Sequence, residues 1–314
     1  MSRCSHLLSL LLAGVLSVSQ FACNSGPSEA PAAAPANASH GQRAFAYTEA
    51  ILKFGPRPPG SPELDAVRGY VTAELARHGW LAQPQSFEMT APDGPRRFTN
   101  LIARYQGKES AEAVAARVPE AILCAHIDSK LMPGDEFLGA DDAASAVAAI
   151  VEIARVLATE DPARAAKLEL VFFDGEESFG PNINETDGLY GSKFYAQQWT
   201  TRGAMPRFGI LLDMIGHKNL RIRIPSDTPA HLRDALMAAA KHQGALDHFG
   251  SSDFPIVDDH VPLNQAGIPT IDIIGDFPRM AWWHTPADNL TIIDPQSLEI
   301  SIGTTLEMLR NLLR

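Results

Sequence analysis

The fold of this chain is predicted by the stretch Lys167-Leu-Glu-Leu-Val-Phe-Phe-Asp-Gly-Glu-Glu-Ser-Phe179. Residues 168–173 form an almost continuous apolar run rich in β-forming residues, which is typical of a strand buried on both faces. Three acids around a glycine follow, and they can lie at the carboxyl end of that strand, where open α/β sheets bind ligands. Of the adjacent Glu176 and Glu177, one can bind a metal while the other moves a proton. A solvated turn is the alternative.

Strands and helices alternate along the rest of the chain. Apolar runs predict strands at 121–125, 208–215 and 270–274, and two earlier strands at 85–89 and 99–105 predict a hairpin around Asp93-Gly94. Helices are predicted at 44–54, 62–78, 143–157, 187–199, 229–242 and 295–313, and an acidic loop at 248–260. This alternation indicates an α/β fold, a doubly wound, mostly parallel mixed sheet with helices on both faces.

Composition limits the class of protein. The chain has 314 residues, of which 45% are hydrophobic, enough to bury a substantial core. We expect one domain over residues 44–314 and a monomer. A formal net charge of −11 argues against nucleic acid, which requires a basic surface. Cys124 is the only cysteine in the expected domain, so no internal disulfide is predicted.

The first residues have the pattern of an export signal. Arg3 is followed by an apolar stretch over 7–18 that is too short to span a membrane. Ala22-Cys23 resembles a bacterial lipoprotein cleavage point, so 1–23 is predicted as a lipoprotein-type signal with a lipid on Cys23. Residues 24–43 read as a flexible tether rich in Pro, Ala and Ser. We therefore expect an exported, periplasmic or cell-envelope protein that meets the membrane only through Cys23.

Acids and histidines follow or end several of the predicted strands. Candidate site residues are His126, Asp142, Glu176, Glu177, Asp213 and His284. A lone histidine is more often structural, and an aspartate before a helix is more often a cap. However, Asp141 and Asp142 are adjacent and one cap suffices, while a charge at Asp213 inside an apolar strand is costly unless it is paired. Carboxylate and imidazole ligands without a thiolate suit catalytic zinc, with cobalt or manganese as alternatives.

Six motifs resemble those of animal-type glutaminyl-peptide cyclotransferases, in the same order. They are His126-Ile-Asp-Ser-Lys130, Gly139-Ala-Asp-Asp142, Phe172-Phe-Asp-Gly-Glu-Glu177, Leu212-Asp213, Asp258-Asp-His260 and Trp283-His-Thr285. These enzymes share their fold with zinc aminopeptidases of the bacterial leucyl aminopeptidase type, and the resemblance covers about residues 44–314. It implies an enzyme that converts the N-terminal Gln of peptides to pyroglutamate and releases ammonia.

The resemblance also implies a role for each residue that matches a motif. Asp142, Glu177 and His284 would bind one zinc ion, Glu176 would be the general acid/base, Asp213 and Asp259 would hydrogen-bond with Glu176, and Trp283 would line the substrate pocket. Two departures stand out. Cys124 lacks the disulfide partner that the animal enzymes usually have. Residues 180–184 replace a tryptophan shortly after the Glu-Glu pair, which leaves the second pocket wall open.

The main rival is a two-zinc aminopeptidase that removes N-terminal residues from peptides. In that enzyme His126 and Asp213 would bind a second zinc, Asp142 would bridge both ions, and Glu176 would activate water. Counting ligands cannot decide, because each is present. Trp283 and Asp258 favour the cyclotransferase, since family aminopeptidases commonly have another aromatic residue and a serine there. A non-catalytic peptide-binding lipoprotein is the third reading, and it would be expected to have lost a ligand or Glu176.

Overall fold

A computed structural model describes residues 37–314, so the predicted signal 1–23 and most of the tether lie outside the described residues. One part of the tether prediction is wrong, because helix α1 (His40–Leu52) begins inside segment 24–43. A capping box explains the early start: the Ser39 side chain accepts from the Gln42 amide, and the Gln42 side chain accepts from the Ser39 amide. The Ser-x-x-Gln pattern predicts a helix start, but it was overlooked because the segment was judged by its Pro, Ala and Ser content.

An eight-stranded mixed sheet forms the centre of the fold, in the order β1-β2-β4-β3-β5-β8-β6-β7. The strands are β1 (Trp80–Ala91), β2 (Gly94–Tyr105), β3 (Ala121–His126), β4 (Leu168–Phe173), β5 (Phe208–Asp213), β6 (Ile222–Ile224), β7 (Phe249–Ser251) and β8 (Thr270–Gly275). Strands β4, β3, β5 and β8 run parallel, whereas β2 and β6 pair antiparallel to their inner neighbours. The predicted α/β class and mixed, mostly parallel sheet are therefore confirmed.

Helices cover both faces of this sheet. They are α1, α2 (Pro62–Ala76), α3 (Ala111–Ala116), α4 (Ala146–Glu160), α5 (Pro162–Ala165), α6 (Tyr190–Trp199), α7 (Ala230–His242), α8 (His260–Gln265) and α9 (Pro295–Leu312). A π-helical turn (Ala140–Ser145) precedes α4, and short 3-10 turns occur at Leu246–His248, Phe277–Arg279 and Leu290–Ile292. Among the described residues, no helix is both long enough and apolar enough to cross a bilayer.

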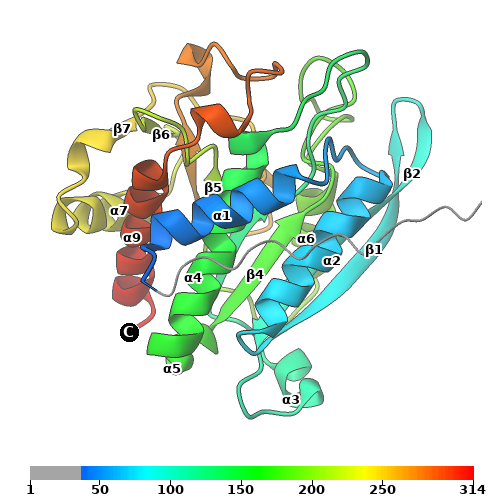
Figure 1. Ribbon diagram of the computed structural model, residues 1–314. Coiled ribbons are helices and arrows are strands. Elements are labelled where there is room, and N and C mark those ends of the chain that lie inside the picture. The colour runs from blue at the N-terminus through cyan, green and yellow to red at the C-terminus, as the bar shows by residue number, and fades with distance from the viewer. Residues whose placement is uncertain (1–36) are drawn as a thin grey trace, which may run out of the picture. The chain divides into compact units, whose positions relative to one another are not determined.

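Strand β4 shows why the run is apolar at every position but Glu169, whose buried carboxylate pairs with Arg104. Leu170 and Phe172 belong to the larger core, which includes residues of α1, α2, α4 and α9. These four helices lie on one side of the sheet (Figure 1). Val171 and Phe173 belong to a second core with Tyr195 of α6. Successive side chains of a strand face opposite sides, so a strand covered on both faces is apolar on both unless a buried polar group is paired.

Two small strands, β6 and β7, and three short helices, α3, α5 and α8, were not predicted. Strand β6 is absent from the sequence interpretation, and the expected loop 248–260 contains β7 and the start of α8. Both strands span only three residues and pair with each other at the sheet edge, so neither has a hydrophobic period of its own. The predicted strand 208–215 ends early, because Met214 has a positive φ of 49°. The chain turns there, and Asp213 is the last residue of β5.

Candidate active site

The three predicted metal ligands come together at the carboxyl edge of the sheet. Asp142 lies in the turn before α4, Glu177 follows β4, and His284 lies in the loop after Phe277–Arg279. The His284 Nε2 atom is 3.4 Å from Asp142 Oδ2 and 3.2 Å from Glu177 Oε1. Ligand atoms about 2.1 Å from a tetrahedral ion lie roughly 3.3 Å apart. The three side chains therefore fit a metal ion without rearrangement.

The electrostatics of this group also favour a cation. Burial lowers the pKa of His284, but its contacts with Asp142 and Glu177 outweigh burial and raise the pKa to about 9. Burial raises the pKa of Asp142, but His126 and His284 outweigh it, so this carboxylate stays ionised. The carboxylates of Asp142 and Glu177 thus face one imidazole in a largely buried space. A positive charge is stabilised strongly in such a field.

Residues outside the predicted set hold Asp142 in place. The Asp288 carboxylate accepts from the Asp141 amide at 2.8 Å and from the Asp142 amide at 3.2 Å. Arg57 is fully buried and donates to the carbonyls of Leu138 and Gly139. Neither residue was predicted to have a role. Asp288 lies in the segment after His284 and Arg57 in the proline-rich segment after α1, so only the folded chain brings them here.

The glycine before this turn is required by geometry. Gly139 has a φ of +56°, and a Cβ atom there would lie 2.0 Å from the Asp142 carbonyl oxygen. Any side chain would push the Asp142 backbone away from the site. His284 also has a positive φ, of 51°, which L residues other than glycine rarely adopt. Such conformations gather at functional sites, where surrounding contacts impose them.

The Glu176-Glu177 turn is held by two residues of the His126-Ile-Asp-Ser-Lys130 motif. Asp128 accepts from the Glu176 and Glu177 amides, at 3.3 Å each. The Lys130 Nζ atom lies 3.3 Å from Glu177 Oε2 and donates to the Ser178 carbonyl at 3.0 Å. Asp128 also approaches the His126 ring, and its Oδ1 atom is 3.6 Å from His126 Nδ1. Its closer contacts are to the turn, which it stabilises directly.

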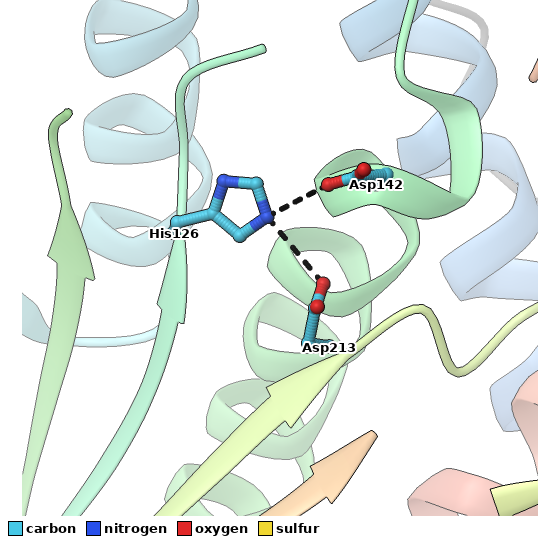
Figure 2. Close-up of side chains that lie close together, drawn as sticks. All are labelled: His126, Asp142 and Asp213. Atoms are coloured by element: carbon cyan, nitrogen blue, oxygen red, sulfur yellow. Dashed lines mark ion pairs between the residues drawn. The ribbon is translucent and has the colours of Figure 1, made fainter. Parts of the chain in front are cut away.

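His126, Asp142 and Asp213 form a second group, shown in Figure 2. His126 extends from the end of β3 toward Asp142 and Asp213, and its Nε2 atom lies 3.0 Å from Asp142 Oδ1 and 3.4 Å from Asp213 Oδ1. The residues predicted for a second metal are therefore also adjacent. The 3.0 Å separation is an ion-pair distance, and neither ring nitrogen of His126 has a hydrogen-bond partner within residues 37–314.

Glu176 is buried beside the metal group with no hydrogen bond to its carboxylate among residues 37–314. Burial raises its pKa well above the usual range, His126 lowers it, and Glu177, Asp258 and Asp259 raise it further. Asp213 and Asp259 were predicted to hydrogen-bond with Glu176, and the described structure has no such bonds. Asp213 contacts His126 instead, and burial raises its pKa to about 8. Of the two acids, Asp259 interacts with Glu176 through its charge.

A pocket of about 270 Å³ opens over these groups. Trp283 lines it as predicted, and its ring lies 4.1 Å from the His284 ring and 4.8 Å from Phe277. The opposite wall, which the sequence left open, is formed by Pro181, Asn182 and Ile183. The remaining lining residues are Asp142, Glu176, Glu177, Ser178, Asp213, Met214, Pro255, Ile256, Val257, Asp258, Ile274 and His284. An apolar pocket thus ends in acids and an imidazole, as expected of a small-molecule site.

Comparisons with known proteins agree with this geometry. Residues 100–309 match peptidase family M28. A glutaminyl-peptide cyclotransferase of Drosophila melanogaster is 33% identical over 269 residues, which cover 76% of this chain and 72% of that protein. The structure of Porphyromonas gingivalis glutaminyl cyclase superposes with a TM-score of 0.76 at 29% identity, over 87% of this chain and 98% of that one.

A peptidase is also among the similar structures. A Zn-dependent exopeptidase from Parabacteroides distasonis gives a TM-score of 0.74 at 27% identity, over 86% of this chain and 98% of that one. The chain therefore belongs to peptidase family M28, a family of metal-dependent α/β enzymes. Within this family it is a homologue of the glutaminyl-peptide cyclotransferases, as its motifs indicated.

Proposed function

We propose that this protein is a glutaminyl-peptide cyclotransferase that converts the N-terminal Gln of peptides to pyroglutamate and releases ammonia. The observation that carries the proposal is the pocket floor. A complete metal-ligand set, the buried Glu176 and the Trp283 ring, which stacks on ligand His284, line the same pocket. The pocket volume suits one small side chain. Relatives with this activity support the same reaction.

Zinc is the metal that the donor types fit best, and one catalytic ion held by Asp142, Glu177 and His284 is part of the proposal. A bound zinc ion would polarise the γ-amide carbonyl of the glutamine. The 3.0 Å ion pair between His126 Nε2 and Asp142 Oδ1 supports one ion here, because a charged His126 would stand beside Asp142 in place of a second metal ion. His126 would then orient a metal ligand and would not bind a metal itself.

Glu176 moves the protons in this reaction. Its carboxylate takes a proton from the α-ammonium group, and the freed amine attacks the γ-carbon of the same residue. The new carbon–nitrogen bond closes the ring, and the ring nitrogen loses its second proton to solvent. Glu176 returns its own proton to the γ-nitrogen, and the bond to that nitrogen breaks to release ammonia. The raised pKa of Glu176 suits a group that must hold a proton between the two steps. Trp283 and Ile183 hold the chain folded in a dry pocket, which favours ring closure.

An aminopeptidase is the second candidate, and the group in Figure 2 is the observation that favours it. If His126 and Asp213 bound a metal, Asp142 would bridge two ions and Glu176 would activate a water molecule.

Export and a lipid anchor on Cys23 stay predictions from the sequence of residues 1–23, which lie outside the described part of the chain.

The two reactions are separated by incubating purified full-length protein with one Gln-initiated and one Leu-initiated peptide. We expect the Gln-initiated peptide to lose the mass of ammonia and the Leu-initiated peptide to stay intact, measured by mass spectrometry and an ammonia assay. Ring closure needs no water nucleophile, so the apolar pocket favours it. If the Leu-initiated peptide is trimmed and the Gln-initiated peptide releases no ammonia, the protein is an aminopeptidase and the cyclotransferase proposal is wrong.

Substitution Trp283→Ala should weaken use of the Gln-initiated peptide without removing the metal. The ring lines the pocket and packs on His284, and loss of such an aromatic contact is worth about 1 kcal/mol, which would reduce kcat/KM roughly 5- to 10-fold. Trp282→Ala is the matched control, since Trp282 contacts His217 and lies outside the pocket lining. Equal losses of kcat/KM in both variants would show that Trp283 does not contact the substrate.

A further inference from the structure

A second group of acidic and imidazole side chains lies behind the pocket wall. It consists of Asp258, His260 and Asp272, which we call the Asp258 cluster. Asp258 lies in the loop before α8, His260 is the first residue of α8, and Asp272 lies within β8. None belongs to the ligand set of Asp142, Glu177 and His284. Asp258 also lines the pocket, so the cluster connects the pocket wall to the sheet.

The polar atoms of this cluster are buried and lack hydrogen-bond partners. His260 and Asp272 have 0% exposure, and Asp258 has 3%. Within residues 37–314, both carboxylate oxygens of Asp272, Asp258 Oδ2 and both ring nitrogens of His260 have no hydrogen-bond partner. A buried polar group without a partner is costly, and several together call for a shared partner. The same property marks Glu177 Oε1 in the candidate catalytic site.

Distances within the cluster suit a bound ion. His260 Nδ1 lies 3.5 Å from Asp272 Oδ2, too far for a good hydrogen bond and close to the roughly 3.3 Å between two ligands of a tetrahedral ion. The Asp258 ligand atom lies within 4.8 Å of both others. The His284 contacts in the candidate catalytic site, at 3.2 and 3.4 Å, have nearly the same spacing.

The charge around the cluster is strongly negative. Asp213 and Asp259 are buried nearby, and both raise the pKa of Asp272, although less than burial and Asp258 do. No lysine or arginine in the described part of the chain forms an ion pair with Asp258, Asp259 or Asp272. Buried carboxylates are tolerated when they are paired or bind a metal. A cation here would neutralise the acids that lie behind Glu176.

We propose that Asp258, His260 and Asp272 bind a second divalent cation of the zinc type, separate from the catalytic ion. His260 coordinates it through Nδ1, and Asp227 faces the other ring nitrogen, Nε2, at 3.8 Å. Imidazole with two carboxylates favours zinc or a similar transition metal over calcium or magnesium, which prefer oxygen alone. The ion ties the loop carrying Ile256 and Val257 to β8 and so holds one wall of the pocket.

The test is metal content per chain, measured by mass spectrometry of the metals in full-length protein after loading with zinc and removal of free ion. Wild type should hold two equivalents, and Asp272→Asn and His260→Gln should each hold one, because the replacements keep the side-chain shape but weaken metal binding. Thermal unfolding should show a Tm lower by at least roughly 3 °C in both variants, since a ligand bound only to the folded state stabilises it. His231→Gln, at an exposed position of α7, is the matched control and should retain two equivalents, and His126→Gln tests the alternative ligands.

The outcomes separate this proposal from the choice of reaction. One equivalent in wild type, or two in Asp272→Asn, would overturn the second site and leave the cyclotransferase untouched. Loss of an equivalent in His126→Gln but not in His260→Gln would place the second ion at His126 and Asp213, which also overturns it. Should the variants fail to fold, anomalous diffraction of wild-type crystals at the zinc edge decides: a peak between His260 and Asp272 supports the site, and its absence overturns it.

Discussion

Replacement of Glu176 by glutamine is expected to reduce turnover by roughly 10²- to 10⁴-fold, the usual contribution of general acid–base catalysis. The amide keeps the size and shape of the side chain but cannot accept the α-ammonium proton. The fold should survive, because Asp128 holds the turn through the backbone amide of residue 176, which the substitution leaves unchanged. Metal content should also be unchanged, because Glu177 and not Glu176 contacts His284.

The measurement is kcat on a Gln-initiated peptide, with metal content and Tm determined on the same preparation. Glu185→Gln is the matched control, since Glu185 is exposed and contributes only its backbone carbonyl to a hydrogen bond with Lys193. Asp213→Asn and Asp259→Asn should have milder effects, because Asp259 acts on Glu176 through charge alone and Asp213 contacts His126. A drop of less than about tenfold in Glu176→Gln would remove this residue from the proton-transfer role.

His284→Ala should lose the catalytic ion and nearly all activity. His284 is the only nitrogen ligand of its group, and without it Asp142 and Glu177 provide two protein ligands where catalytic zinc sites have three. Removing the imidazole also leaves two buried carboxylates without the positive partner whose pKa they raise to about 9. Metal content should therefore fall by one equivalent relative to wild type, and added zinc should restore little turnover.

Exposed His231 on α7 supplies the control variant, His231→Ala, which should keep full metal content and activity. Heterocyclic chelators should inactivate the wild type, and zinc should reactivate it. Full turnover together with an unchanged metal count in His284→Ala would show that the ligand assignment is wrong. These measurements are independent of the Asp258 cluster, because His284 forms no ion pair with His260 or Asp272 within residues 37–314.

The positions of the site residues were predictable because they follow strands. Parallel strands β3, β4 and β5 end at one edge of the sheet, and His126, the Glu176-Glu177 turn and Asp213 lie at or just after those ends. Such residues must lie near one another once the sheet forms, whatever the loops do. The apolar runs required burial on both faces, so the fold class also followed from local sequence.

The surroundings of these residues depended on contacts between distant segments. Arg57, Asp288 and Lys130 hold the ligand loops through hydrogen bonds to groups up to 147 positions away along the chain. Nothing in their local sequence marks them, because an arginine in a loop and an aspartate near a surface turn are common. The second pocket wall, at Pro181, Asn182 and Ile183, could not be predicted from the sequence either, because irregular segments take their conformation from what they pack against.

The sheet and the residues at its strand ends could thus be predicted from residue types and their spacing. Backbone hydrogen bonding and burial give the side chains of a strand a period of two, and parallel strands end at a common edge. The Ser39 capping box could also have been predicted from the sequence, but it was missed. Three features followed only from the folded chain. They are the acids that surround Glu176, the arginine that supports Asp142, and the way in which β6, β7 and α8 bring Asp258 next to Asp272. Side-chain distances of a few ångströms depend on tertiary packing, which has no period along the sequence.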